Sequence, residues 1–206
     1  MLGLSNQKDL LVLSEDLLLG EGMGRKCYID PEDKSLCVKI ASQRAKRSAK
    51  REINYFKRLH KRGKSFEMIA DYHGDIITNL GNGNLYELVR DHDGRISKNL
   101  EHYLALDDEV ITFSILELIE NLRLYLKKEY ILFSDLDMDN ILVKKINEDD
   151  YKLMVIDGIG DNNQIPLLEY FPLLGIKRCI KKWDKFKRGV TKKFPDLTKS
   201  IKDFND

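Results

Sequence analysis

The decisive stretch of this sequence is Ile131-Leu132-Phe133-Ser134-Asp135-Leu136-Asp137-Met138-Asp139-Asn140-Ile141-Leu142-Val143, an apolar run followed by an acidic loop and a strand-like run. Asp157 ends the next strand-like run, 153–156. Carboxylates and amides gathered at one place repel each other unless a cation compensates, and hard oxygens of this kind suit Mg²⁺. Mg²⁺ held by one or two carboxylates and substrate phosphates is typical of phosphoryl transfer. A solvated loop rich in Asp and Asn is the alternative if the loop stands alone.

A glycine cluster and a strand lysine precede this loop. Gly20, Gly22 and Gly24 lie between two strand-like runs, where glycine lets the backbone approach a ligand and leaves N–H groups for phosphate oxygens. Lys39 lies among apolar strand residues, which is unfavourable unless its ammonium has a charge partner or faces a cleft. Glu52 is the candidate partner, because it is the one acidic residue in a strongly basic segment. A plain turn and an intrahelical ion pair are the alternatives.

The N-terminal half has the pattern of short strands and turns. Apolar runs separated by turn residues predict a small, mostly antiparallel sheet over residues 11–40 and 75–89, with a turn at 79–83. One helix interrupts it, because the stretch 45–60 lacks proline and glycine. The predicted apolar face of this helix is Ile53, Phe56 and Leu59.

The C-terminal half has a helical pattern with two short strands. Apolar residues recur at steps of three and four over 111–125, which predicts an amphipathic helix with Asp107 and Asp108 at its start. Strands are predicted at 141–143 and 153–156, each beside acidic residues. The change of pattern predicts a β-rich N-terminal part and a helical C-terminal part.

Composition excludes several classes of protein. With 42% hydrophobic and 33% charged residues, the chain is too apolar to be disordered, and no apolar run approaches the roughly 20 residues that span a bilayer. The three cysteines cannot all pair and none has CxxC spacing, which argues against a disulfide framework and a zinc cluster. Because no secretory signal is visible at Met1–Ser5, we expect a cytoplasmic protein.

The order of these parts is that of the protein-kinase-like fold: glycine loop, strand lysine, helix glutamate, Asp-x₄-Asn loop and strand-terminal aspartate. From roughly 10 to 188 the chain resembles the YrbL-like family of kinase-like proteins, named for the PhoP regulatory network. The most specific stretches are Gly81-Asn82-Gly83-Asn84-Leu85-Tyr86-Glu87-Leu88-Val89-Arg90-Asp91, 133–143 and 155–161. The resemblance implies an α+β, compact bilobal kinase-like fold, with a β-rich nucleotide-binding lobe over 1–90 and a reduced helical catalytic lobe over 91–206.

The resemblance implies a nucleotide site. The glycine loop would cover the phosphates of ATP. Lys39 would contact the α- and β-phosphates and pair with Glu52. The segment Glu87-Leu88-Val89 would be the hinge whose backbone meets adenine, with Tyr86 at the gatekeeper position.

The resemblance also implies a catalytic and metal site in the acidic loop. Asp135 would orient or deprotonate the acceptor hydroxyl, and Asn140 and Asp157 would hold Mg²⁺. Three departures from protein kinases stand out: the loop motif has Ser134 in place of arginine, Asp157 is followed by glycine rather than phenylalanine, and Asp137 replaces the lysine commonly found two residues after the catalytic aspartate. With no Ala-Pro-Glu motif and little chain after Asp157, the lobe that presents peptides in eukaryotic kinases is not expected. The loop is closer in style to aminoglycoside and lipopolysaccharide-core kinases.

A last helix is predicted from about 173 to 186. Its predicted apolar stripe is Leu173, Ile176, Ile180 and Trp183. Basic residues surround Trp183 and Phe186, so this helix either docks on the helical lobe with solvated lysines or touches an anionic membrane surface or nucleic acid. We expect docking; nucleic acid is not expected as a partner, and peripheral membrane contact is the weaker alternative.

The expected function is therefore an ATP- and Mg²⁺-dependent phosphotransferase that moves the γ-phosphoryl group to a hydroxyl acceptor, a protein or a small molecule. The alternative is a pseudokinase, a nucleotide-binding regulatory module that signals through a partner. A third hypothesis, a basic adaptor for nucleic acid or membranes, rests only on the charge blocks, of which residues 44–64 and 177–206 are the basic ones. The sequence does not identify the acceptor.

Overall fold

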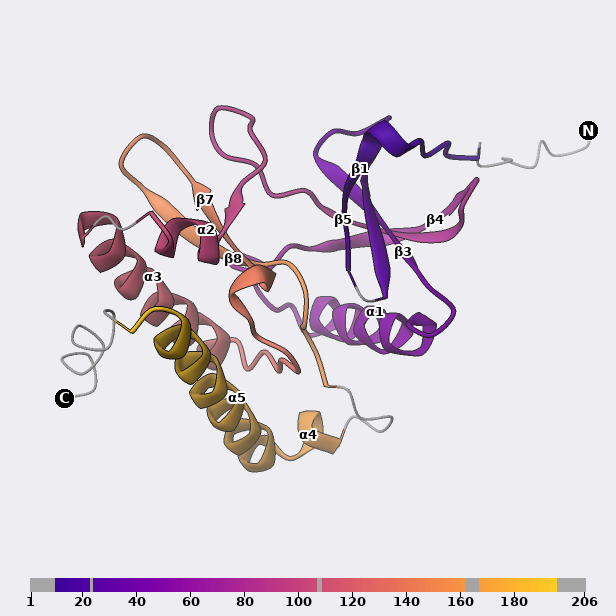
Figure 1. Ribbon diagram of the computed structural model, residues 1–206. Coiled ribbons are helices and arrows are strands. Elements are labelled where there is room, and N and C mark those ends of the chain that lie inside the picture. Colours follow the sequence, from indigo (N-terminus) through magenta and orange to yellow (C-terminus); the bar gives the residue numbers. More distant parts are fainter. Residues whose placement is uncertain (1–9, 23, 107–108, 162–166, 196–206) are drawn as a thin grey trace, which may run out of the picture. The chain divides into compact units, whose positions relative to one another are not determined.

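The computed structural model describes residues 10–22, 24–106, 109–161 and 167–195 (Figure 1). Helices and two antiparallel sheets make up these residues, which confirms the α+β class. The chain divides into two compact units. Unit 1 comprises Met1–Ala49 and Asp71–Leu88, and unit 2 comprises Lys50–Ala70 and Val89–Asp206.

Unit 1 is built on a five-stranded antiparallel sheet of order β1-β2-β3-β5-β4. Its strands are β1 (Leu18–Glu21), β2 (Arg25–Ile29), β3 (Leu36–Ala41), β4 (Tyr72–Thr78) and β5 (Gly81–Glu87). The buried side chains of Tyr28 and Val38, each at most 1% exposed, form its core with Leu11 and Leu13. The predicted strands are therefore largely confirmed, although Leu11 forms only an isolated bridge to Thr78.

Local turn chemistry sets the register of this sheet. Asp30 is buried between β2 and β3, and its Oδ1 accepts hydrogen bonds from the N–H groups of Glu32 and Asp33. This Asx turn joins the two strands as the sequence predicts. The predicted turn at 79–83 is too long, because β5 already begins at Gly81 and pairs with Thr78.

Helix α1 (Lys46–Lys61) confirms the helix predicted at 45–60. Its apolar face is buried at Tyr55, Phe56 and Leu59, and Ile53 is half-buried. The division between the units falls inside this helix, after Ala49. The first turn of α1 therefore belongs to unit 1 and the remaining turns to unit 2.

Unit 2 contains a three-stranded antiparallel sheet of order β6-β7-β8 and four further helices among the described residues. The elements are β6 (Lys98–Asn99), α2 (Leu100–Leu104), α3 (Glu109–Lys128), β7 (Ile141–Lys145), β8 (Tyr151–Val155), α4 (Leu167–Tyr170) and α5 (Pro172–Lys193). The strands β7 and β8 confirm the two predicted after the acidic loop. The short elements β6 and α2 were not anticipated from the sequence, because two and five residues carry too little periodicity.

Helix α3 confirms the helix predicted over 111–125. Ile115 and Leu122 are at most 2% exposed, and Tyr125 is also buried. The side chain of Ile111 and the predicted start at Asp107 and Asp108 lie outside the described residues. None of the described helices is long and apolar enough to span a membrane.

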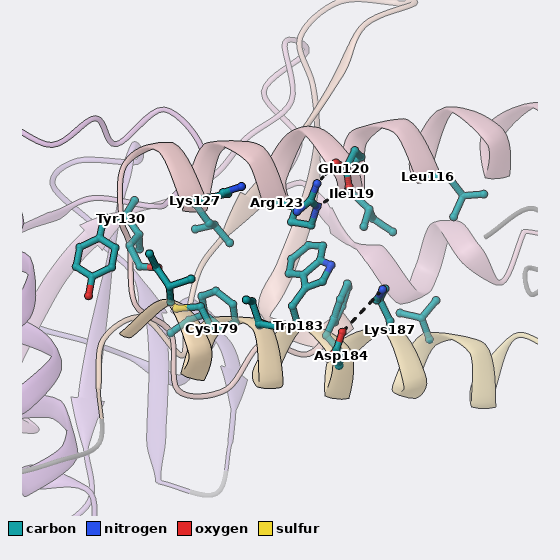
Figure 2. Close-up of a pocket in the computed structure, with 17 residues that line it drawn as sticks. Leu116, Ile119, Glu120, Arg123, Lys127, Tyr130, Cys179, Trp183, Asp184 and Lys187 are labelled. Atoms are coloured by element: carbon teal, nitrogen blue, oxygen red, sulfur yellow. Dashed lines mark hydrogen bonds and ion pairs between the residues drawn. The ribbon is translucent and has the colours of Figure 1, made fainter. Parts of the chain in front are cut away.

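Helix α5 runs alongside α3, and Figure 2 shows Trp183 projecting from α5 toward α3. The predicted helix is confirmed and continues to Lys193, but its predicted stripe is wrong at the N-terminal end, where Leu173 is 78% and Ile180 56% exposed. The buried side chains are Trp183, Phe186 and Val190. Ile176 and Ile180 line the same side toward α3 as Trp183, but they stay exposed because the space there is open. A groove of about 500 Å³ remains between the two helices.

Candidate functional site

The acidic loop of unit 2, residues 134–140, alternates buried apolar side chains with exposed carboxylates. Leu136 and Met138 are buried, whereas Asp135, Asp137 and Asp139 are exposed. Oδ1 of Asp137 accepts a hydrogen bond of 2.7 Å from the N–H of Met138 and caps a short 3₁₀ helix, Met138–Asn140. The loop therefore presents Asp135 to solvent on a fixed backbone.

Gly158 joins this loop to the segment after β8. The N–H of Ser134 donates a 2.8 Å hydrogen bond to the carbonyl of Gly158. Gly158 has φ of +78°, and a Cβ placed on it would lie 1.9 Å from the carbonyl oxygen of Asp135. Only glycine fits here, since both the backbone conformation and the close approach exclude a side chain. The backbones that carry Asp135 and Asp157 are thereby held in direct contact.

Asn140 completes the cluster. Its Nδ2 donates a 3.3 Å hydrogen bond to the carbonyl of Asp135, and its own carbonyl accepts from the N–H of Ile156 at 2.9 Å. Asp157 follows Ile156, and its Oδ1 accepts a 2.7 Å hydrogen bond from the N–H of Gly158. The three residues predicted for catalysis and metal binding, Asp135, Asn140 and Asp157, thus share one cluster of backbone and side-chain hydrogen bonds. We name it the acidic cluster.

The acidic cluster offers oxygen donors for a hard cation. Because Nδ2 of Asn140 is engaged with the Asp135 carbonyl, Oδ1 is its donor atom for a metal. The described residues contain no group of three His, Cys, Asp or Glu side chains that could hold a metal alone. Mg²⁺ typically takes one or two carboxylates and completes its shell with water and substrate phosphates. Asn140 and Asp157 therefore fit Mg²⁺ that arrives with a phosphate ligand.

The lysine predicted to meet phosphates is buried in unit 1. Lys39 lies on β3 with 8% of its surface exposed, and its Nζ is 4.6 Å from the centre of the Tyr86 ring on β5. An ammonium over an aromatic face gains a favourable cation–π interaction. Nearby on β3, the pKa of Cys37 is raised by its hydrogen bond with Cys27 and by burial, so this thiol stays protonated and is no nucleophile.

The glycine loop contains two glycines that the fold itself does not require. Gly24 is needed for packing, because a Cβ there would lie 2.8 Å from the Cβ of Ala45. At Gly20 and Gly22 a Cβ would meet no atom closer than 4.0 Å, and neither residue has positive φ. Both are exposed. The N–H of Gly22 donates to the carbonyl of Arg25 at 2.9 Å, so the two glycines leave the backbone without a covering side chain but do not leave this N–H free.

The remaining predicted nucleotide residues are distributed over both units. Glu52 lies on α1 in unit 2 and is 7% exposed. The predicted hinge spans the division between the units, which falls between Leu88 and Val89. The N–H of Glu87 donates to the carbonyl of Asp71 at 2.9 Å, and the carbonyl of Val89 accepts from the N–H of Ser97 at 3.2 Å. The Lys39–Glu52 ion pair stays a prediction, since the two residues belong to different units.

Sequence reasoning missed a basic residue beside the acidic cluster. Nζ of Lys185 on α5 lies 3.7 Å from Oδ1 of Asp135, and both side chains are mostly exposed. Arg178, two turns earlier on α5, pairs with Asp161 at 2.9 Å. The sequence shows α5 to be basic, but acidic partners 17 and 50 residues earlier in the chain have no local signal. The basic face of α5 is therefore partly ion-paired with unit 2 rather than simply solvated.

Comparisons with known proteins identify the family of this chain. Residues 11–191 match the model of the family described as PhoP regulatory network protein YrbL. The protein YrbL of Escherichia coli is 31% identical to this chain over 183 residues, which cover 86% of either chain. The YrbL protein of Shigella flexneri matches with the same identity and coverage. The match includes the glycine loop, Lys39 and the acidic cluster, and the chain belongs to the YrbL family.

Proposed function

We propose that this chain is a phosphotransferase with a protein-kinase-like fold, which moves the γ-phosphoryl group of Mg-ATP to a hydroxyl acceptor. The observation that carries the proposal is the acidic cluster, in which Gly158 holds the backbone of Asp135 against the segment that carries Asp157. Phosphoryl transfer depends mainly on positioning and charge stabilisation, so a rigid set of one exposed carboxylate and two metal donors suits it.

The chemistry assigns a different task to each residue of the acidic cluster. The acceptor oxygen forms a bond to the γ-phosphorus while the bond from that phosphorus to the β–γ bridging oxygen breaks, and ADP leaves. The hydroxyl proton passes to the carboxylate of Asp135, which is exposed and reachable by an acceptor. Asn140 and Asp157 would hold Mg²⁺ on the phosphates, where the ion neutralises their charge.

Unit 1 supports the nucleotide part of the proposal. The fold does not require glycine at Gly20 or Gly22, and no side chain covers the backbone there. Lys39 is a buried cation on β3. Burying a lysine is unfavourable unless its charge is used. We assign the glycine loop and Lys39 to the phosphates of ATP, and the backbone of 87–89 to the adenine.

The alternative is a pseudokinase that binds the nucleotide and performs no transfer. The departures from protein-kinase motifs at Ser134 and Asp137 favour it. The intact acidic cluster favours the enzyme, because a module that only binds ATP has no need for an exposed carboxylate beside its metal donors. Both forms predict Mg-ATP binding, and they differ in what Asp135 does.

The experiment compares three substitutions that each remove one negative charge from the same region. Asp135→Asn should leave the affinity for Mg-ATP unchanged and lower phosphoryl transfer by about 10²–10⁴-fold, the usual contribution of a positioned base. Asp157→Asn should weaken Mg-ATP binding itself, because a neutral amide replaces an anionic metal donor. Asp139→Asn, on the same loop, is the control and should change neither.

Binding and transfer have separate assays. Saturating Mg-ATP at about 100 times Kd should stabilise the wild-type protein by about 2.7 kcal/mol, which thermal unfolding measures, and ATP without Mg²⁺ should do much less. Transfer is followed with γ-labelled ATP and cell extract as the source of acceptors. No stabilisation by Mg-ATP in folded protein contradicts the proposal. Binding with equal labelling by wild type and Asp135→Asn supports the pseudokinase.

A further inference from the structure

Among the described residues, three ion pairs of unequal character join helix α5 to other parts of unit 2. Asp161, the partner of Arg178, has a side chain only 4% exposed. Lys193, at the last turn, pairs with Glu101 at 2.5 Å, which raises the pKa of Lys193. The pair between them along the helix joins Lys185 to Asp135, the residue assigned to the acceptor hydroxyl.

The Lys185–Asp135 pair is not needed to hold α5 in place. The two side chains are 70% and 60% exposed and their charged atoms are 3.7 Å apart, so solvent screens the pair and it stabilises the fold little. The buried side chains of Trp183, Phe186 and Val190 fix the rotation of α5 against α3 (Figure 2). At about 100° per residue, Lys185 then lies on the side of α5 away from Trp183. Packing thus determines that this lysine reaches Asp135.

The acidic cluster has a surplus of negative charge where another negative group must enter. Asp135 and Asp137 lie two residues apart, and the segment of Asp157 is joined to Asp135 through Gly158. Asp137 occupies the position where protein kinases commonly have a lysine, and its carboxylate is used to cap the 3₁₀ helix. A transferring phosphoryl group develops charge on its oxygens that positive groups stabilise. The acidic loop itself supplies no such group.

We propose that Lys185 supplies this positive charge and binds the γ-phosphate of ATP during transfer. The inference rests on the proposed function and names a further catalytic residue for it. The ammonium is a compact charge on a flexible four-carbon chain, so it can leave Asp135 for a phosphate oxygen bound at the acidic cluster. The lysine missing from the acidic loop is replaced, in space, by a lysine from α5.

The test measures discrimination between ATP and ADP, which differ by the γ-phosphate. Calorimetry gives Kd for Mg-ATP and Mg-ADP with the wild-type protein, Lys185→Met and Lys185→Arg. Lys185→Met should weaken Mg-ATP binding by about tenfold, the effect of one lost charge-assisted hydrogen bond, and leave Mg-ADP binding unchanged. Lys185→Arg keeps the charge and should recover most of the loss. The control Lys193→Met removes another ion pair of α5 and should change neither affinity.

Each outcome separates this inference from the proposed function. If Lys185→Met binds both nucleotides as the wild type does, or loses affinity for both equally, Lys185 does not bind the γ-phosphate, while the proposed function stands. If the wild type binds ATP but transfers no phosphate, the proposed phosphotransferase activity is refuted. A loss of affinity for ATP but not ADP in Lys185→Met would still show that Lys185 binds the γ-phosphate. If the wild type binds neither nucleotide, both proposals are wrong. A lower melting temperature with unchanged affinities would assign Lys185 a purely structural role.

Discussion

Replacing Gly158 by alanine tests the contact on which the acidic cluster depends. Two costs follow from the structure. Positive φ costs an alanine about 1–2 kcal/mol. The new Cβ would also lie 1.9 Å from the Asp135 carbonyl oxygen, so the two segments must separate and the Ser134–Gly158 hydrogen bond is lost. Leaving such buried backbone groups unpaired costs about 1–3 kcal/mol, which gives a total of about 2–5 kcal/mol.

Gly63 provides the matched control. It has φ of +62°, but a Cβ there would meet no atom within 4 Å, so Gly63→Ala has the conformational cost without the clash. Urea unfolding of the wild type and both variants measures the two costs, with the slope of the transition checking that the unfolded state is unchanged. Gly158→Ala should be the more destabilised and should also lose Mg-ATP binding. Equal losses of stability in the two variants would refute the argument that Gly158 holds the two segments together.

Three further predictions concern other parts of the chain. Gly22→Ala should leave the free energy of unfolding unchanged or raise it by up to about 1 kcal/mol, yet weaken Mg-ATP binding; unchanged binding would mean that the loop does not cover phosphates. The side chain of Glu169 is 1% exposed and is bound by Arg58 and Arg62, so Glu169→Gln should lower the free energy of chemical unfolding by about 2–3 kcal/mol. Glu120→Gln, in a more exposed pair, should lower it by less than about 1 kcal/mol. Burial raises the pKa of Tyr125 to about 12, so its contribution to stability is complete below pH 10, the unfolded value, and is lost between pH 10 and 12. Stability measured against pH should therefore fall less steeply in Tyr125→Phe, and identical slopes would contradict this assignment.

The spacing of apolar residues correctly predicted the helices and strands in which that spacing marks a single buried face. Helix α1 and the strands β2 and β3 belong to this group, because their apolar residues repeat with one clear period. Helix α5 does not, since its sequence pattern cannot show how closely α3 packs along it. Ile180 lines the same groove as the buried Trp183, yet Ile180 and Leu173 are exposed, contrary to the sequence prediction.

The sequence likewise predicted some residues of the candidate site and missed others. Asp135, Asn140 and Asp157 were predicted together from their order along the chain, and the structure brings them into one cluster. The role of Gly158 as the contact between their segments requires an interatomic distance that no motif contains. Lys185 was missed for the same reason, because an ion pair between residues so distant in sequence arises only from the docking of α5.

The last turns of α1 have a consequence for the order in which the chain folds during synthesis. Tyr55 accepts a hydrogen bond from the N–H of Leu132, 77 residues later, and Arg58 donates to Glu169, 111 residues later. At about 5–20 residues per second, the ribosome makes Glu169 on the order of 5–20 s after Arg58. During that interval the bond of Arg58 to Glu169 cannot form, whereas the hairpin of β2 and β3 and the ring of Phe66 that stacks on Phe56 have already been made. A nascent chain halted before residue 130 should therefore leave Tyr55 and Arg58 more exposed than one extended past α5, which protection of α1 from proteolysis would measure.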